Sequence, residues 1–156
     1  MPAARSSPHV AARAAPSSPP DRAGAPDPVP DPVAIVLARA NRIVSGSDYR
    51  SVVRRGRRSA TAHVVVSVVR RTPGGAVAVD APTRFGFIVA KTVGNAVTRN
   101  LLRRRFKAIA HELLTEVPTG HDVVIRALPA AAGATWPTLL EDVSRSFARG
   151  VEKAAA

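Results

Sequence analysis

The chain has 156 residues and carries 23 lysines and arginines against 11 aspartates and glutamates, a formal net charge of +12. Cysteine is absent, which excludes disulfide frameworks, thiolate zinc sites and cysteine nucleophiles. No apolar run approaches the roughly 18–20 residues that a membrane-spanning helix needs. One compact domain with a tail is expected, and the positive charge makes a polyanion the first class of partner to consider.

Most of the positive charge belongs to one part of the sequence. Residues 41–110 hold 15 basic residues and only two acidic ones, Asp48 and Asp80. Residues 1–40 and 111–156 are close to neutral, with net charges of +1 and −2. A polyanion is therefore expected to bind the middle of the chain, and the C-terminal part is expected to support the fold.

The first 40 residues differ from the rest in composition, because they hold nine of the 14 prolines. Proline breaks helices and cannot donate to a strand ladder, so residues 1–40 are expected to be a disordered Pro/Ala-rich tail. Met1 is the only methionine, and some bacterial genes start on a codon that otherwise encodes valine. We hypothesise that Val36 is the true start and that residues 1–35 come from a mis-called one, which the intact mass of the native protein would test.

Beyond residue 41, β-branched runs predict strands, and amphipathic runs with capping residues predict helices. Ser47 and Asn95 are expected to cap the first two helices, and Gly56 is expected to take the left-handed conformation after the first. The expected elements are a helix over 48–55, strands over 62–69, 76–79 and 84–91, a helix over 96–116, a strand over 122–127 and a helix over 136–149.

This order, αβββαβα, predicts an α/β protein of the α+β sandwich type with one four-stranded mixed sheet. The domain is expected over residues 41–150, followed by a disordered C-terminus over residues 151–156. The four histidines lie far apart in the sequence and show no metal-ligand spacing.

The segment 91–107, KTVGNAVTRNLLRRRFK, carries the clearest functional pattern, because it contains six cations and no acid. On a helix, Arg99, Arg103, Lys107, Asn100 and Arg104 fall within an arc of about 140°. A separate arc of about 60° holds the apolar residues, which are Leu102, Phe106, Ile109 and Leu113. One face is therefore predicted to pack on the sheet, and the face beside it is predicted to be basic.

A solvated helix usually mixes charges of both signs, because like charges four residues apart repel one another. Nothing in the first turns of this helix offsets the repulsion between Arg99, Arg103 and Lys107. Guanidinium groups bind phosphate through two parallel hydrogen bonds, so a polyphosphate partner would relieve the repulsion. The alternative interpretation is a soluble basic helix that binds nothing.

The segment GNAVTRN at residues 94–100, followed by a basic run, resembles the signature of the protein subunits of bacterial ribonuclease P. The resemblance covers about residues 41–150. Asn41-Arg42-Ile43 with Asp48-Tyr49 and Gly56 is similar to the N-terminal helix of that family. Residues 84–91 are similar to its third strand, and residues 121–125 are similar to its fourth.

The resemblance implies an α/β sandwich with a left-handed β-α-β crossover, whereas general rules favour the right-handed form in about 98% of cases. It implies a cytoplasmic bacterial ribonucleoprotein, an endoribonuclease that removes the 5′ leader of precursor tRNA and leaves a 5′-phosphate. The RNA subunit performs the hydrolysis with bound Mg²⁺, and the protein contributes no catalytic residue and no metal site. The implied partners are the ribonuclease P RNA and precursor tRNA, with no membrane and no obligate protein partner.

The residues that the resemblance assigns to the RNA subunit lie in and around the basic helix. They are Lys91, Asn95, Arg99, Asn100, Arg103, Arg104, Arg105 and Lys107. Two positions depart from the family pattern, because Leu101 replaces a usual arginine and Thr92 replaces a common lysine. Arg105 is expected to compensate in part for Leu101.

A second group of residues is implied to line a cleft for the leader between the sheet and the first helix: Arg42, Tyr49 and Val53. Tyr49 matches an aromatic position and can stack on a base. Its alternative role is that of a core residue with its hydroxyl at the surface. Val53 stands where another aromatic residue is frequent, so stacking is lost there.

Two other functions remain open on the sequence. One is a non-catalytic RNA-binding protein of the ribosomal or RNA-chaperone type on the same fold. The other is a nuclease that needs no RNA subunit, which the lack of clustered carboxylates in the basic region disfavours.

Overall fold

The computed structural model describes residues 36–75 and 77–156, so residues 1–35 of the expected tail over residues 1–40 lie outside the described residues. The helices and strands follow the expected order αβββαβα. They are α1 (Gly46–Arg55), β1 (Arg57–Ala60), β2 (Val64–Arg70), β3 (Arg84–Ile88), α2 (Ala96–Leu113), β4 (His121–Ala127) and α3 (Trp136–Ala155), with the short 3-10 helices η3 (Arg39–Asn41), η4 (Lys91–Val93) and η5 (Pro129–Gly133).

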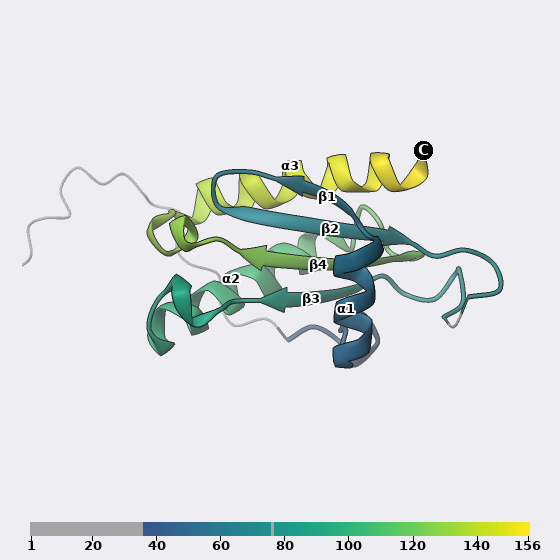
Figure 1. The fold of residues 1–156 in the computed structure, drawn as a ribbon, viewed down its shortest axis with the longest axis horizontal. Helices are drawn as coiled ribbons and strands as arrows, with labels where there is room; N and C mark the ends of the chain where they lie inside the picture. The colour runs from purple at the N-terminus through teal and green to yellow at the C-terminus, as the bar shows by residue number, and fades with distance from the viewer. Residues whose placement is uncertain (1–35, 76) are drawn as a thin grey trace, which may run out of the picture. The chain divides into compact units, whose positions relative to one another are not determined.

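The four strands form one mixed sheet in the order β1-β2-β4-β3. β1 pairs with β2 and β2 pairs with β4 in antiparallel fashion, whereas β3 and β4 are parallel neighbours joined through α2. In Figure 1, β3 and β4 point the same way, β4 lies above β3, and α2 passes behind the sheet. This arrangement makes the crossover left-handed, as the family resemblance implies.

The helices divide between the two faces of the sheet (Figure 1). The main core lies between the sheet and the helices α2 and α3, where Phe85, Phe106 and Phe147 are almost completely buried. A smaller cluster on the opposite face places Val52 of α1 over Val124 of β4. The strands therefore alternate between a large core on one face and a small apolar contact with α1 on the other.

One of the four expected strands is wrong. Residues 77–79 are not in a strand, and Ala76 lies outside the described residues. The fourth strand is instead β1, which pairs Arg57 with Val68 and Ala60 with Val65. Its sequence RRSA has a single buried side chain, Ser59, so no apolar alternation reveals it.

The ends of the helices also differ from the prediction. Ser45 rather than Ser47 caps α1, because the Ser45 hydroxyl accepts a hydrogen bond from the Asp48 amide at 3.3 Å. Gly56 is extended, with φ −68°. Glycine is needed there because a Cβ atom would lie 2.4 Å from the Val52 carbonyl oxygen.

The ordered domain is longer at both ends than the expected residues 41–150. Leu37 is only 2% exposed and belongs to the main core, so residues 36–40 are not part of a disordered tail. α3 continues to Ala155, so residues 151–155 are helical rather than disordered. The helix reaches this length because it stays amphipathic, with Val151 and Ala154 packed against the core.

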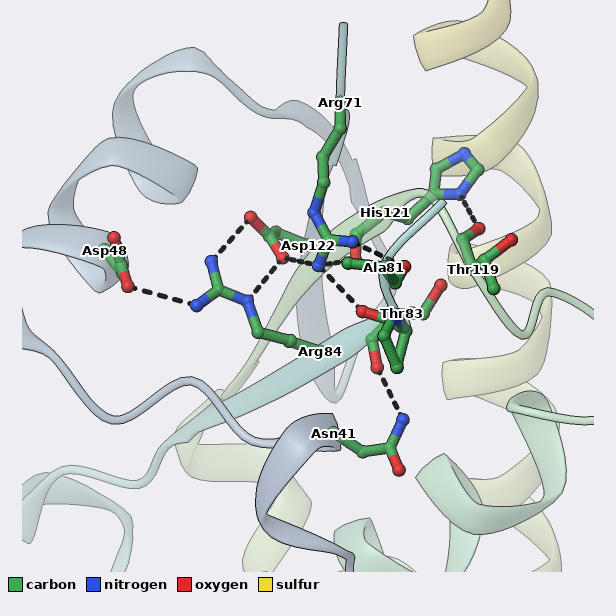
Figure 2. A network of polar contacts seen from close by, with 10 residues as sticks. Asn41, Asp48, Arg71, Ala81, Thr83, Arg84, Thr119, His121 and Asp122 are labelled. Carbon is green, nitrogen blue, oxygen red and sulfur yellow. Dashed lines mark hydrogen bonds and ion pairs between the residues drawn. The ribbon is translucent and has the colours of Figure 1, made fainter. Parts of the chain in front are cut away.

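A buried ionic network joins α1 to the sheet beside the small apolar cluster (Figure 2). Both carboxylate oxygens of Asp122, on β4, accept hydrogen bonds from Arg84, on β3, at 2.9 Å. Arg71 donates to the same carboxylate at 2.6 Å, and Arg84 also donates to Asp48, on α1, at 3.2 Å. The network therefore connects three elements of the sheet face with the helix above it.

Arg71 extends the network to the backbone that precedes β3 and to the first residue of β4. Its guanidinium donates to the carbonyl oxygens of Ala81, Pro82 and His121 at 2.7, 2.8 and 3.2 Å. Burial alone raises the pKa of Asp122, but the hydrogen bonds from Arg84 and Arg71 outweigh this effect and leave that pKa below its ordinary value. The same hydrogen bond with Asp122 raises the pKa of Arg84.

The depressed pKa of Asp122 gives a prediction for the pH dependence of stability. The ionised carboxylate stabilises the fold above its unfolded pKa, near 3.9, and this contribution is lost as the pH falls through the folded pKa. We expect Asp122→Asn to lower the free energy of unfolding by about 3 kcal/mol at neutral pH. Urea unfolding from pH 7 downward should show the difference from wild type shrinking as the pH falls below that unfolded value.

Asp80→Asn is the matched control, because Asp80 is exposed and forms no ion pair with a described residue. It should change the free energy of unfolding by less than about 0.5 kcal/mol. A loss for Asp122→Asn that stays constant with pH would contradict an ionic role for Asp122.

Candidate nucleic-acid interface

α2 divides into an apolar face and a basic face, as the sequence predicts. Leu102, Phe106, Ile109 and Leu113 are each at most 2% exposed and pack in the main core. Asn100 and Arg104 are exposed, and Arg99, Arg103 and Lys107 are half-buried. We call these last five residues the α2 basic surface.

The charges of this surface are not neutralised by carboxylates. Within residues 36–75 and 77–156, no ion pair involves Arg99, Arg103, Arg104 or Lys107. The first turn of α2 contains no acid. Cations near the N-terminus of a helix also oppose the helix dipole, so this arrangement costs stability that an external anion would restore.

Two arginines of the surface, Arg99 and Arg103, are oriented by carbonyl oxygens rather than by acids. Arg99 Nε donates to the Gly94 carbonyl oxygen at 3.1 Å. Arg103 donates to Asn100 Oδ1 at 3.4 Å and to the Val89 carbonyl oxygen, just beyond β3, at 3.5 Å. A hydrogen bond to a carbonyl orients a guanidinium group and leaves its charge and its other N–H groups available.

Two predicted contact residues also have structural roles. Asn95 caps α2, because its Oδ1 accepts a hydrogen bond from the Thr98 amide at 2.9 Å. Arg105 Nη1 donates to the Ala134 carbonyl oxygen at 3.0 Å. Arg105 therefore binds the backbone of the segment between η5 and α3. Lys91 is exposed in η4, immediately before α2.

Tyr49 belongs to α1, and its side chain lies against the other face of the sheet. Its hydroxyl oxygen accepts a hydrogen bond from the Phe87 amide at 3.2 Å. Its ring covers Gly86, because a Cβ atom there would lie 2.5 Å from Tyr49 Cε1. Glycine is therefore required at position 86 for the ring to lie against β3, and the half-buried ring leaves one part accessible.

The other two predicted cleft residues flank Tyr49 on different sides. Arg42 is exposed and forms a parallel bridge with Phe85 along the outer edge of β3. Val53, one turn after Tyr49 on α1, is half-buried and packs against the small cluster.

A row of four residues crosses the sheet beside α1. The strand register aligns Ala60 with Val65, Val65 with Arg126, and Arg126 with Ile88. Since Val124, two residues before Arg126, packs under α1, the row lies on the same face as that helix. Ala60 and Arg126 are exposed and Val65 and Ile88 are half-buried. We call this set the open row.

The sequence indicated none of the four residues of this row, and Arg126 is the only charged one among them. It stands in an inner strand between Val65 and Ile88, and it has no ion pair with a described residue. The available signal was its position, since Arg126 interrupts a run of buried residues from Asp122 to Ile125. A lone arginine on a half-exposed apolar strip fits a phosphate whose neighbouring base packs on the strip.

The described residues offer neither a metal centre nor a membrane span. No group of three or more His, Cys, Asp or Glu side chains converges in this part of the chain. None of the helices that the structure describes combines the length and apolar character needed to cross a bilayer.

Comparison with known proteins agrees with the geometry. The family model described as Ribonuclease P matches residues 37–150. The ribonuclease P protein component of Clavibacter michiganensis subsp. michiganensis is 53% identical over 116 residues, which cover 74% of this chain and 97% of that protein. The corresponding protein of Arthrobacter sp. (strain FB24) is 45% identical over 112 residues, which cover 72% of this chain and 78% of that protein.

Solved structures show the same fold. The ribonuclease P protein of Staphylococcus aureus superposes with a TM-score of 0.59 at 22% identity, covering 70% of this chain and 94% of that one. The protein from Thermotoga maritima superposes with a TM-score of 0.56 at 21% identity, covering 67% and 92%. With its matching motif, fold and relatives, the chain belongs to the ribonuclease P protein family.

Proposed function

We propose that this protein is the RNA-binding subunit of ribonuclease P and assists a catalytic RNA in removing the 5′ leader from precursor tRNA. The observation that carries the proposal is the α2 basic surface, whose cations have no carboxylate partner among the described residues and follow the family motif. In this role the holoenzyme is a bacterial cytoplasmic endoribonuclease, and hydrolysis occurs on the RNA subunit.

The α2 basic surface, with Lys91 and Asn95, is assigned to the RNA subunit. Arginine forks suit phosphate oxygens, and Asn100 can reach a sugar or a base edge. The helix N-terminus adds favourable potential for a phosphate. Arg105 is assigned a weaker contact, since part of its hydrogen-bonding capacity holds Ala134.

The open row, together with Arg42, Tyr49 and Val53, is assigned to the leader. Tyr49 provides a ring at the β3 end, and Arg126 provides a positive charge at the centre. Ile88 and Val65 provide apolar surface on either side of Arg126. This combination of stacking surface and phosphate contact is typical of single-stranded RNA sites.

No protein group is assigned to hydrolysis in this proposal. The described residues offer no converging set of metal ligands, so Mg²⁺ is assigned to the RNA subunit. The work of the protein is then to bind and orient two RNA molecules.

Cleavage of precursor tRNA at low Mg²⁺ concentration tests the proposal as a whole. We expect the RNA subunit alone to cleave slowly, the protein alone to be inactive and the mixture to cleave fast. Cleavage by the protein alone would identify a nuclease that needs no RNA subunit. A lack of stimulation would instead favour a ribosomal or chaperone-type RNA-binding protein.

The α2 basic surface makes a separate prediction about salt dependence. Replacing Arg99 and Arg103 with alanine should weaken binding to the RNA subunit, because two phosphate contacts are lost. The slope of log K against log salt concentration should then fall by about two. Filter binding across a salt series measures this.

The matched control is Arg149→Ala with Lys153→Ala on α3, which removes the same charge at the same spacing from residues without an ion pair among the described residues. It should leave the slope within about 0.5 of wild type. Equal slopes for the α2 variant and wild type would refute the assignment.

Tyr49 makes a prediction that separates its two roles. Tyr49→Ala should cost about 1–3 kcal/mol in affinity for precursor tRNA because base stacking is lost, while affinity for leaderless tRNA should not change. Tyr49→Phe keeps the ring but loses the hydroxyl that accepts from Phe87, and it should retain most of the leader affinity. An equal loss of affinity for both substrates would mean that Tyr49 only supports the fold.

A further inference from the structure

The outer face of α1 is a second basic surface that the proposed function does not use. Arg50, Arg54 and Arg55 are exposed there. With Ser47 and Ser51 they line a shallow hollow of about 400 Å³. The lining consists of guanidinium and hydroxyl groups, which donate hydrogen bonds and suit phosphate oxygens.

The charge of this face is not balanced within the described part of the molecule. Residues 46–58 contain five arginines and one acid, Asp48. The Asp48 carboxylate is bound by Arg84 of the sheet, at 3.2 Å, and by none of those five. Arg50, Arg54 and Arg55 form no ion pair with any residue that the structure describes.

Helix stability accounts for only part of this pattern. Arg54 and Arg55 lie in the last turn of α1, where cations interact favourably with the helix dipole. Arg50 lies one turn earlier and faces Arg54 at the i, i+4 spacing, where like charges repel. A ligand of negative charge would relieve the repulsion and would account for the exposure of all three arginines without an ion pair.

The position of α1 indicates which RNA reaches this face. The α2 basic surface meets the β3 end of the open row, since Arg103 donates to the Val89 carbonyl oxygen just beyond Ile88. The C-terminus of α1 lies two residues back along β1 from the opposite end of the row, Ala60, because Arg58 of β1 donates to the Val53 carbonyl oxygen at 3.5 Å. In Figure 1, α1 crosses in front of the sheet and leads directly into β1.

We propose that the outer face of α1 binds the phosphate backbone of the upstream part of the 5′ leader, after the strand has left the open row at β1. This inference rests on the proposed function. The row crosses four strands about 4.8 Å apart, roughly 14 Å in total, which accommodates about four stacked nucleotides at 3.4 Å each. In this proposal a longer leader extends past Ala60, turns back along β1 toward Arg58, and there comes beside Arg54 and Arg50.

The experiment compares precursor tRNAs whose leaders have about three and about twelve nucleotides, one inside and one beyond the length of the row. Binding to the holoenzyme assembled with the RNA subunit is measured for wild type and for Arg50→Gln with Arg54→Gln. Arg149→Gln with Lys153→Gln on α3 is the control, since it removes two exposed cations at the same spacing. Circular dichroism checks that each variant is folded.

We expect wild type to bind the long leader more tightly than the short one. The α1 variant should lose roughly tenfold in affinity for the long leader, with a salt slope lower by about 1.4. For the short leader it should lose no more than the control does. If the ratio of the affinities for the long and the short leader is the same in the α1 variant as in wild type, the inference is overturned. It is also overturned if wild type binds the two leaders with equal affinity.

Two further results separate this inference from the proposed function. A loss of affinity for the RNA subunit in the absence of substrate would overturn the inference, because α1 would then face that RNA instead of the leader. Arg126→Gln should weaken binding of both leaders, since both occupy the row. If Arg126→Gln weakens neither leader, the leader site of the proposed function fails, whatever α1 does.

Discussion

The structure depends on two groups of arginines, one paired with a buried carboxylate and one without a carboxylate partner among the described residues. Arg71 and Arg84 lie against the carboxylate of Asp122, where hydrogen bonds and opposite charge stabilise the buried ions. Arg99, Arg103 and Arg104 lie on a helix surface without a carboxylate partner among the described residues. The first group holds α1, β3 and β4 together. The second group keeps a positive potential that a polyanion can neutralise.

Helix α1 connects the buried ionic network to the RNA-facing side of the sheet that the proposed function assigns. The network ends at Asp48. The ring of the next residue, Tyr49, packs against Gly86, and its hydroxyl oxygen accepts a hydrogen bond from the Phe87 amide. The buried ions therefore fix the position of the helix that borders the open row. A change at Asp122 would act on RNA binding indirectly, through the orientation of α1. A change at Arg103 would act directly and leave the sheet intact, since its hydrogen bonds run to Asn100 and the end of β3.

The sequence predicted the elements that carry strong local signals. The apolar arc of α2 and its cap at Asn95 both appear where expected. β1 was missed because its stability comes from pairing with β2 and from contact with α3, neither of which leaves an apolar pattern in RRSA. The same limit applies to the candidate site. Helical spacing brings Arg99 and Arg103 together, whereas only the strand register places Arg126 beside Val65 and Ile88.

The left-handed crossover determines which helix lies at the β3 end of the open row. β3, α2 and β4 bring the basic helix to one end of the open row, because α2 begins just beyond β3 and ends just before β4. The antiparallel strands β2 and β1 extend the row in the other direction, toward the C-terminus of α1. The two ends of the row therefore differ chemically, because the motif-bearing helix lies at one end and the other end, Ala60, lies two residues along β1 from Arg58 and the C-terminus of α1. In the proposed function, these different ends would bind a leader that lies across the sheet with a defined polarity.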